Sequence, residues 1–111
     1  MDIRKYILLI LLALAGVMQM QAQADRQFIR NGNKLYRQHN YAKAETEYRK
    51  ALSKNARNTQ AMYNLGCALM MQQKDSAAIV QLQNAGRSEQ SPRRKAMAYH
   101  NIGVICQQHR M

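Results

Sequence analysis

The sequence predicts an all-α protein in which antiparallel helix pairs stack as a short solenoid of about two and a half repeats behind a secretory leader. Three observations favour this fold. Apolar and small residues recur at an offset of 34 residues, and within each copy they follow helical spacing. The 111 residues include only one Pro and five Gly, too few for the many turns of an all-β fold.

The first element is the leader, residues 1–24. It begins with two basic residues, continues through the apolar stretch 7–18, and has small residues at Ala22 and Ala24, the layout of a secretory signal. We therefore expect cleavage just after Ala24 and an exported protein, periplasmic or in the cell envelope. The apolar stretch is shorter than the roughly 20 residues that span a bilayer comfortably, and a retained membrane anchor stays open as the alternative.

The repeats follow the leader. The matched pairs at the 34-residue offset are Phe28 with Met62, Gly32 with Gly66, Leu35 with Leu69, Ala44 with Ala78, Tyr48 with Leu82, and Ala51 with Ala85. A third copy starts after an insertion of three residues, because Gly103 follows Gly66 by 37. The predicted division is 25–58 for the first repeat, 59–92 for the second, and 93–111 for the first helix of a third, incomplete repeat.

Five helices are expected within these repeats, at about 26–38, 42–54, 59–73, 76–86 and 92–109. Asn58 is placed to cap the third helix, and Ser91 before Pro92 is a favourable start for the fifth. The repeated glycines fall in mid-helix, where Gly is about 1 kcal/mol less favourable than Ala. Close contact between the helices of a pair, with Ala44 or Ala78 facing the glycine, would offset that cost.

The period and the pattern of Phe28, Gly32, Tyr41, Ala44, Tyr48 and Ala51 resemble the tetratricopeptide repeat. The segments Arg-Asn-Gly-Asn-Lys-Leu-Tyr and Tyr-Ala-Lys-Ala-Glu-Thr-Glu-Tyr-Arg-Lys-Ala-Leu are, more narrowly, similar to the exported repeat proteins of the Bacteroidetes aerotolerance operon. That resemblance implies a protein-binding scaffold in the envelope, beside membrane-bound partners with von Willebrand type A domains. Departures include Asn31, where Leu is usual, and Asp75, where an aromatic residue is usual.

The resemblance also implies that the first helix of each pair lines a concave groove. Helical spacing places the candidate peptide-binding residues there: Arg26, Arg30, Asn33, Arg37, Tyr63, Asn64, Cys67, Met70, His100 and Asn101. Ile29, Met71, Met97, Val104 and Gln108 are expected along the same surface. Asparagine amides can hydrogen-bond the backbone of an extended peptide, and arginine can pair with carboxylates. The Asn and Lys/Arg clamp that some of these repeats use for a terminal carboxylate is not predicted, because three groove positions that would need cations hold Ile29, Met97 and Asn101.

Charge indicates the kind of partner. Lys and Arg outnumber Asp and Glu by 17 to 6, and removal of the leader leaves 15 to 5, a net charge of +10. Such a surface attracts anionic partners, and export argues against nucleic acid. The expected function is binding of a protein or peptide, and the alternative is peripheral binding to an anionic membrane through the basic residues of the first repeat helix.

Catalysis, metal binding and cofactors find little support. Cys67 and Cys106 are 39 residues apart and are expected to be buried free thiols, with a disulfide as the alternative. A Cys67 nucleophile with His100 as its base is an enzymatic arrangement that we do not favour. The protein is therefore expected to be a non-enzyme without metal or cofactor.

The last helix is expected to have an uncovered flank, since the pattern stops before a second helix of the third pair. Either the fifth helix is itself the cap of the array, or the exposed flank is a docking surface for a partner or a second copy. We expect self-association or dependence on a partner.

Overall fold

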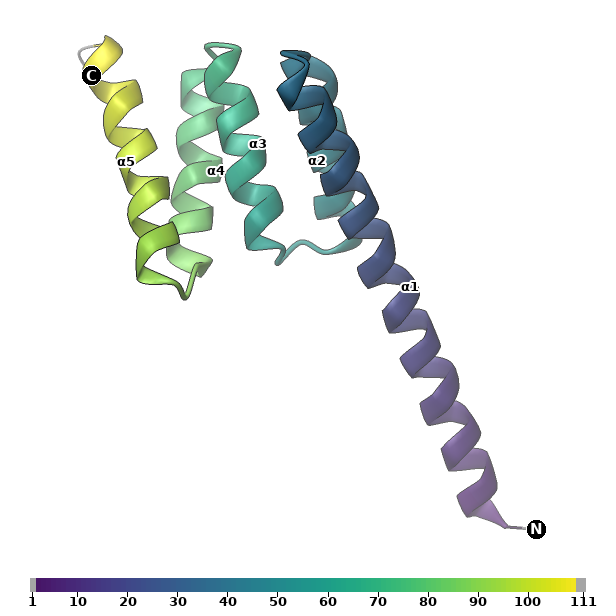
Figure 1. Cartoon of the computed structure of the whole chain (residues 1–111). Coiled ribbons are helices and arrows are strands. Elements are labelled where there is room, and N and C mark those ends of the chain that lie inside the picture. Colours follow the sequence, from purple (N-terminus) through teal and green to yellow (C-terminus); the bar gives the residue numbers. More distant parts are fainter. Residues whose placement is uncertain (1, 110–111) are drawn as a thin grey trace.

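A computed structural model describes residues 2–109, which are helical throughout apart from short connections and contain no strand. The helices are α1 (Ile3–Arg37), α2 (Tyr41–Lys54), α3 (Thr59–Met71), α4 (Asp75–Ser88) and α5 (Pro92–His109). Each helix contacts the next along the chain, and α3 also touches α1 and α5. In Figure 1, α1 lies in front of α2 and α3 in front of α4, so that α1, α3 and α5 form one layer. The all-α prediction and the stacked helix pairs are confirmed.

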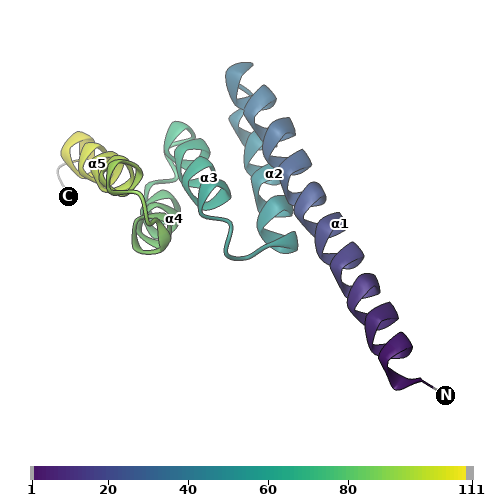
Figure 2. The same ribbon diagram turned by 60° about the horizontal axis from the view of Figure 1, so that its bottom comes forward.

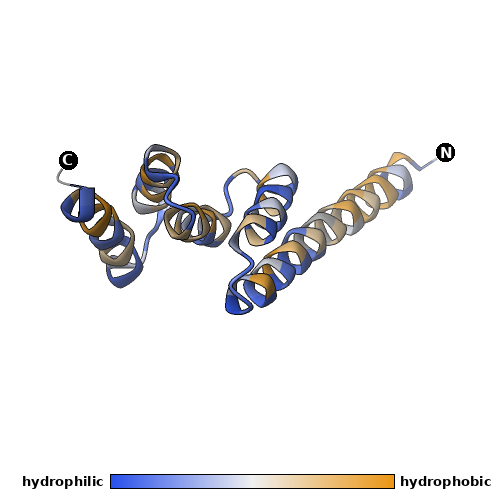
Figure 3. Cartoon of the chain, turned by 90° about the horizontal axis from the view of Figure 1, so that it is seen from above, coloured by the Kyte–Doolittle hydropathy of each residue, from blue (hydrophilic) through white to orange (hydrophobic). Residues whose placement is uncertain are grey.

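The first helix is much longer than the predicted helix 26–38. It runs unbroken for 35 residues, through the expected leader and into the first helix pair. No Pro, Gly or capping residue lies between Met18 and Ala24, where Gln, Met and Ala favour continuation. In length and composition α1 could cross a membrane. Its N-terminal half is exposed and apolar, and it extends away from the other helices (Figures 2 and 3).

The turns inside the two complete pairs have the same geometry, 34 residues apart. His39 and Gln73 both adopt the left-handed conformation, with φ of 58° and 61°. After each, the chain returns a backbone hydrogen bond to the end of the preceding helix, from Asn40 N to Leu35 O and from Lys74 N to Leu69 O, at 2.9 and 3.0 Å. This is a common way to satisfy the last carbonyls of a helix. The repeat therefore holds for the backbone of the turn as well as for the side chains.

The predicted starts of the third and fifth helices, at residues 59 and 92, are confirmed. Asn58 caps α3, because its side-chain oxygen accepts the backbone N–H of Ala61 at 3.0 Å. Pro92 begins α5, and the Ser91 hydroxyl lies 3.5 Å from the backbone nitrogen of Arg94. Asp75 begins α4, one residue before the predicted start at 76.

The core lies between the layers, and its largest buried side chains are Tyr48, Leu65, Leu69, Leu82 and Ile105. Close approach at the first two repeat glycines is confirmed, but the expected neighbours were wrong. The atoms nearest to a β-carbon at Gly32 or Gly66 belong to Tyr48 and Leu82, not to the alanines four residues earlier. A large side chain on the second helix therefore fills the space above each glycine.

Gly103 has no such neighbour. A β-carbon added there would find no atom within 4 Å. Since the corresponding glycines of α1 and α3 are covered by α2 and α4, this face of α5 is the uncovered flank that the sequence predicts, within the described residues.

Candidate functional site

Adjoining hollows run along the layer formed by α1, α3 and α5, and we call them together the groove. One, of about 290 Å³, lies between α1 and α3 and is lined by Asn33, Tyr36, Arg37, Tyr48, Tyr63, Asn64 and Cys67. A second, of about 560 Å³, is lined by Thr59, Gln60, Tyr63, Asn64, Ala85, Glu89, Ser91, Arg93, Arg94, Met97 and Ala98. A third, of about 380 Å³, is lined by Tyr63, Arg93, Ala96, Met97, His100 and Asn101. Tyr63 borders all three, so the hollows join at the middle of the groove.

Asn33 is the centre of a hydrogen-bonded group in the first hollow. Its side-chain oxygen accepts the Tyr48 hydroxyl at 2.7 Å and the Asn64 amide at 3.1 Å. The Tyr48 ring is buried, and this burial, together with the nearby Tyr36 and Cys67, raises the pKa of Tyr48 to about 12. Tyr48 therefore stays a neutral donor at physiological pH. Because Asn33 Oδ1 already accepts two hydrogen bonds, its amide NH₂ is the part that can contact a ligand.

Asn101 forms a second group across the groove, between α5 and α3. Its amide donates to the Tyr63 hydroxyl at 3.0 Å and lies 3.6 Å from Cys67 Sγ. Burial and the neighbouring thiol raise the pKa of Tyr63 to about 12. Burial also raises the pKa of the Cys67 thiol, against the opposing effect of its hydrogen bonds with Tyr63 and Asn101. The thiol is therefore protonated near neutral pH, which disfavours a thiolate nucleophile.

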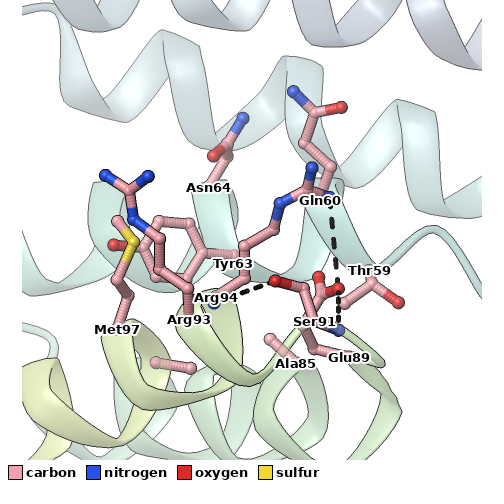
Figure 4. A pocket seen from close by; sticks show the side chains of 11 residues that line it. Thr59, Gln60, Tyr63, Asn64, Ala85, Glu89, Ser91, Arg93, Arg94 and Met97 are labelled. Carbon is pink, nitrogen blue, oxygen red and sulfur yellow. Dashed lines mark hydrogen bonds and ion pairs between the residues drawn. The ribbon is translucent and has the colours of Figure 1, made fainter.

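In the largest of the three hollows, the side formed by α3 carries the side-chain amides of Gln60 and Asn64. The side formed by α5, which we call the cationic wall, carries Arg93 and Arg94. Figure 4 shows Gln60, Tyr63 and Asn64 of α3 pointing into the same space as Arg93 and Arg94 of α5. Glu89 accepts the Ser91 backbone N–H at 3.1 Å, and its carboxylate is 4.0 Å from the Arg94 guanidinium. The Arg94 side chain is nevertheless 73% exposed, so water screens this ion pair strongly. Both guanidinium groups can therefore reach an anionic ligand.

Most of the predicted site residues do line the groove. The residues that it brings together are Asn33, Arg37, Tyr63, Asn64, Cys67, His100 and Asn101. Arg26 and Arg30 lie outside the three hollows, exposed on α1. Met70 is half-buried against the core, and Ile29 is a core residue at 5% exposure. Helical spacing alone misplaced Ile29 because it lies near the edge between the groove face and the face that packs on Ala51 and Ala61.

The sequence pattern did not indicate the cationic wall. Arg93 and Arg94 follow the three-residue insertion and occupy the first turn of α5. In the sequence they are basic residues on an exposed helix, which are usually a solvated face. The Ser-Pro helix start fixes where α5 begins, but the path of the chain between α4 and α5 sets which of its residues face Thr59 and Gln60.

Cys67 and Cys106 are both free, as the sequence favoured, but each is half-buried and not fully buried as expected. In the part of the chain that the structure describes, no three His, Cys, Asp or Glu side chains gather where they could hold a metal ion. No protein-family model matches the chain, and no curated protein matches it. The groove itself is therefore the best guide to the function of the protein.

Proposed function

We propose that this protein is an adaptor that binds an extended, acidic segment of a partner protein along the groove. The observation that carries the proposal is the arrangement in the largest hollow, where side-chain amides of α3 face two arginines of α5 across about 560 Å³. Amides are suited to the polar backbone of a peptide, whereas guanidinium groups are suited to its carboxylates. The net charge of +11 favours a partner of opposite charge over a second copy of the chain.

The hydrogen bonds within the groove support an extended peptide rather than a compact ligand. Asn33 presents free amide hydrogens, while the Asn64 side-chain oxygen keeps its acceptor capacity. The Asn33 amide nitrogen is a donor and the Asn64 side-chain oxygen is an acceptor, and they lie on neighbouring helices. This arrangement matches the alternating C=O and N–H groups of an extended backbone. The groups are held in place by Tyr48 and by packing, so little side-chain entropy is lost on binding.

We propose further that the array is of the tetratricopeptide type and works in the bacterial envelope, in a complex of the kind formed by aerotolerance proteins. The equal turns after α1 and α3, 34 residues apart, support the repeat assignment. The exposed apolar half of α1 supports export, because such a surface is unfavourable in water and suits a secretory signal or a membrane anchor.

Site-specific photo-crosslinking in the native envelope tests the adaptor function. A photoreactive residue at His100, exposed in the groove, should capture a polypeptide partner, and the same residue at Val80, 51% exposed on α4, is the matched control. The captured segment should be acidic, and the double variant Arg93→Gln with Arg94→Gln should weaken its binding about tenfold, or roughly 1.4 kcal/mol. Equal capture at both positions would contradict the groove as the binding surface.

A second candidate function is binding to an anionic membrane surface. Arg26, Arg30 and Lys34 are exposed on α1, which continues directly into the apolar segment. Flotation with anionic vesicles separates the two candidates. Neutralising these three residues should abolish flotation if lipid is the partner, while the Arg93 and Arg94 variants should leave it unchanged. Flotation that requires salt below about 0.1 M, with no crosslinked protein, would favour the membrane over the adaptor.

A further inference from the structure

Asp25 is a buried carboxylate at the point where α1 begins to pack. Its residue is 3% exposed, whereas every side chain described between Asp2 and Gln23 is exposed. Oδ2 accepts a hydrogen bond from the Asn58 amide at 3.0 Å. Oδ1 is buried too, and it has no hydrogen-bond partner among the residues that the structure describes. In the intact helix, the buried Oδ1 atom of Asp25 thus lacks a hydrogen-bond donor among the described residues, which is an unfavourable arrangement.

The other carboxylate oxygen, Oδ2, is fixed by its hydrogen bond to Asn58. Asn58 donates to Asp25 with its amide while its oxygen caps α3 through Ala61 N. Asp25 therefore fixes the orientation of the capping residue, and it connects the start of the first repeat to the start of the second. A displacement of Asp25 that gave Oδ1 a donor elsewhere would break this connection. A donor for Oδ1 must therefore become available next to Asp25 while Oδ2 stays bonded to Asn58.

We propose that the Ala24–Asp25 peptide bond is a processing site, and that the new chain end supplies the donors for Asp25 Oδ1. This inference rests on the export proposed above. Water adds across the bond: its oxygen completes a carboxylate on Ala24, and both of its protons go to the Asp25 nitrogen, which becomes an α-ammonium group. The enzyme required is an endopeptidase that accepts small residues such as Ala22 and Ala24 before the cut.

Cleavage would place Asp25 at the start of a helix, whereas in the intact chain it lies inside α1. In the intact chain its nitrogen is a neutral amide inside α1. After cleavage the nitrogen carries a positive charge next to its own carboxylate, and the N–H groups of Gln27 and Phe28 lose the carbonyls one turn earlier. Asp is among the residues preferred at this position, because its side chain accepts such N–H groups and its charge suits the N-terminal end of a helix. Oδ1 can then be paired while Oδ2 remains with Asn58.

The test uses two forms of the full gene product, each as the wild type and as Asp25→Asn. One form is recovered from the envelope of the producing cell, and the other is made by cell-free translation without membranes, where no leader peptidase acts. Mass spectrometry should show that the envelope form begins at Asp25. Asp25→Asn, which keeps a partner for Asn58 but removes the charge, should lower the melting temperature of the cut form by about 4 °C and should not lower that of the uncut form.

Asp75→Asn is the matched control, since Asp75 begins another helix and its effect should be the same in both forms. An equal effect of Asp25→Asn in both forms would overturn the proposed pairing. A chain that reaches the envelope uncut would overturn the processing step alone. A chain that remains in the cytoplasm by cell fractionation would overturn the proposed export as well, while crosslinking from the groove tests the adaptor function separately.

Discussion

Leu82 of α4 lies directly over Gly66 of α3, so that a β-carbon at residue 66 would be 2.7 Å from Leu82 Cγ. Tyr48 covers Gly32 in the same way one repeat earlier. Leu82 Cγ is the branch point of a fully buried side chain and not its flexible end, so the clash is relieved only if the whole side chain or α4 shifts. The distance between α3 and α4 therefore depends on the absence of a side chain at residue 66.

Gly66→Ala should destabilise the protein. Alanine is favoured over glycine in a helix by about 1 kcal/mol. Forcing a methyl group into a well-packed contact costs about 1–3 kcal/mol, so the net loss in the free energy of unfolding should be about 1 kcal/mol. Urea denaturation followed by circular dichroism measures this change.

Gly103→Ala is the matched control, because this glycine is also in a helix and a β-carbon there meets no atom within 4 Å. It should stabilise the protein by up to about 1 kcal/mol. A loss of stability in this variant would mean that another helix covers Gly103 in solution, and a concentration dependence of the loss would identify a second copy of the chain.

Glu45 should make the fold sensitive to acid. Burial alone would raise the pKa of Glu45, but hydrogen bonds from Arg49, Lys74 and Gln72 outweigh it and hold the pKa below its usual value of 4.5. A carboxyl group with a lowered pKa in the folded state stabilises the fold above its unfolded pKa, and this contribution is lost as the pH falls through the folded value. Since Lys74 and Arg49 are about half exposed, the contribution should be only about 1 kcal/mol.

Glu45→Gln should therefore lower the free energy of unfolding at pH 7, and the difference from the wild type should shrink as the pH falls below 4.5 and vanish once the folded carboxyl is protonated. Glu47→Gln is the control, because Glu47 pairs with Lys50 on its own helix at 3.2 Å and α2 alone provides both partners. It should change stability by less than about 0.5 kcal/mol. Equal effects of the two variants would mean that the bond from α2 to Lys74 and Gln72 does not contribute.

Tyr48 and Tyr63 should ionise late in an alkaline titration. Their burial raises both pKa values from 10 to about 12, so the ionised form is disfavoured in the fold. The resulting stability is present below about pH 10 and is lost as the pH rises toward 12. Tyrosinate absorbance should show a late step that Tyr48→Phe and Tyr63→Phe each reduce. Tyr99→Phe, at a ring that is 43% exposed, should leave that step unchanged.

The sequence predicted the fold more fully than the site, for physical reasons. Repeat spacing and helical periodicity report which residues face the core, so the helix pairs, the Asn58 cap and the close approach at Gly66 followed from them. The partner of each glycine did not, because whether Ala78 or Leu82 lies opposite depends on the shift of one helix along the other. The cationic wall was missed for a similar reason. Which surface Arg93 faces is set by the path of the chain between α4 and α5, which periodicity within α5 does not report.

Cys67 should be a slow-reacting thiol that reports occupation of the groove. It lines the hollow between α1 and α3, and burial raises its pKa above the usual value of 9.0. Since the thiolate is the reactive form, iodoacetamide should modify Cys67 near pH 7.5 at least tenfold more slowly than in urea.

Two single-cysteine variants separate the thiols. Cys106→Ser leaves Cys67 as the single thiol, and Cys67→Ser provides the comparison at Cys106, whose neighbours in α5 lie outside the three hollows. An acidic peptide bound in the groove should slow alkylation of Cys67 further and leave Cys106 unaffected. Equal protection of both cysteines would point to general stabilisation of the fold, and a rate at Cys67 equal to that in urea would contradict a protonated, half-buried thiol in the groove.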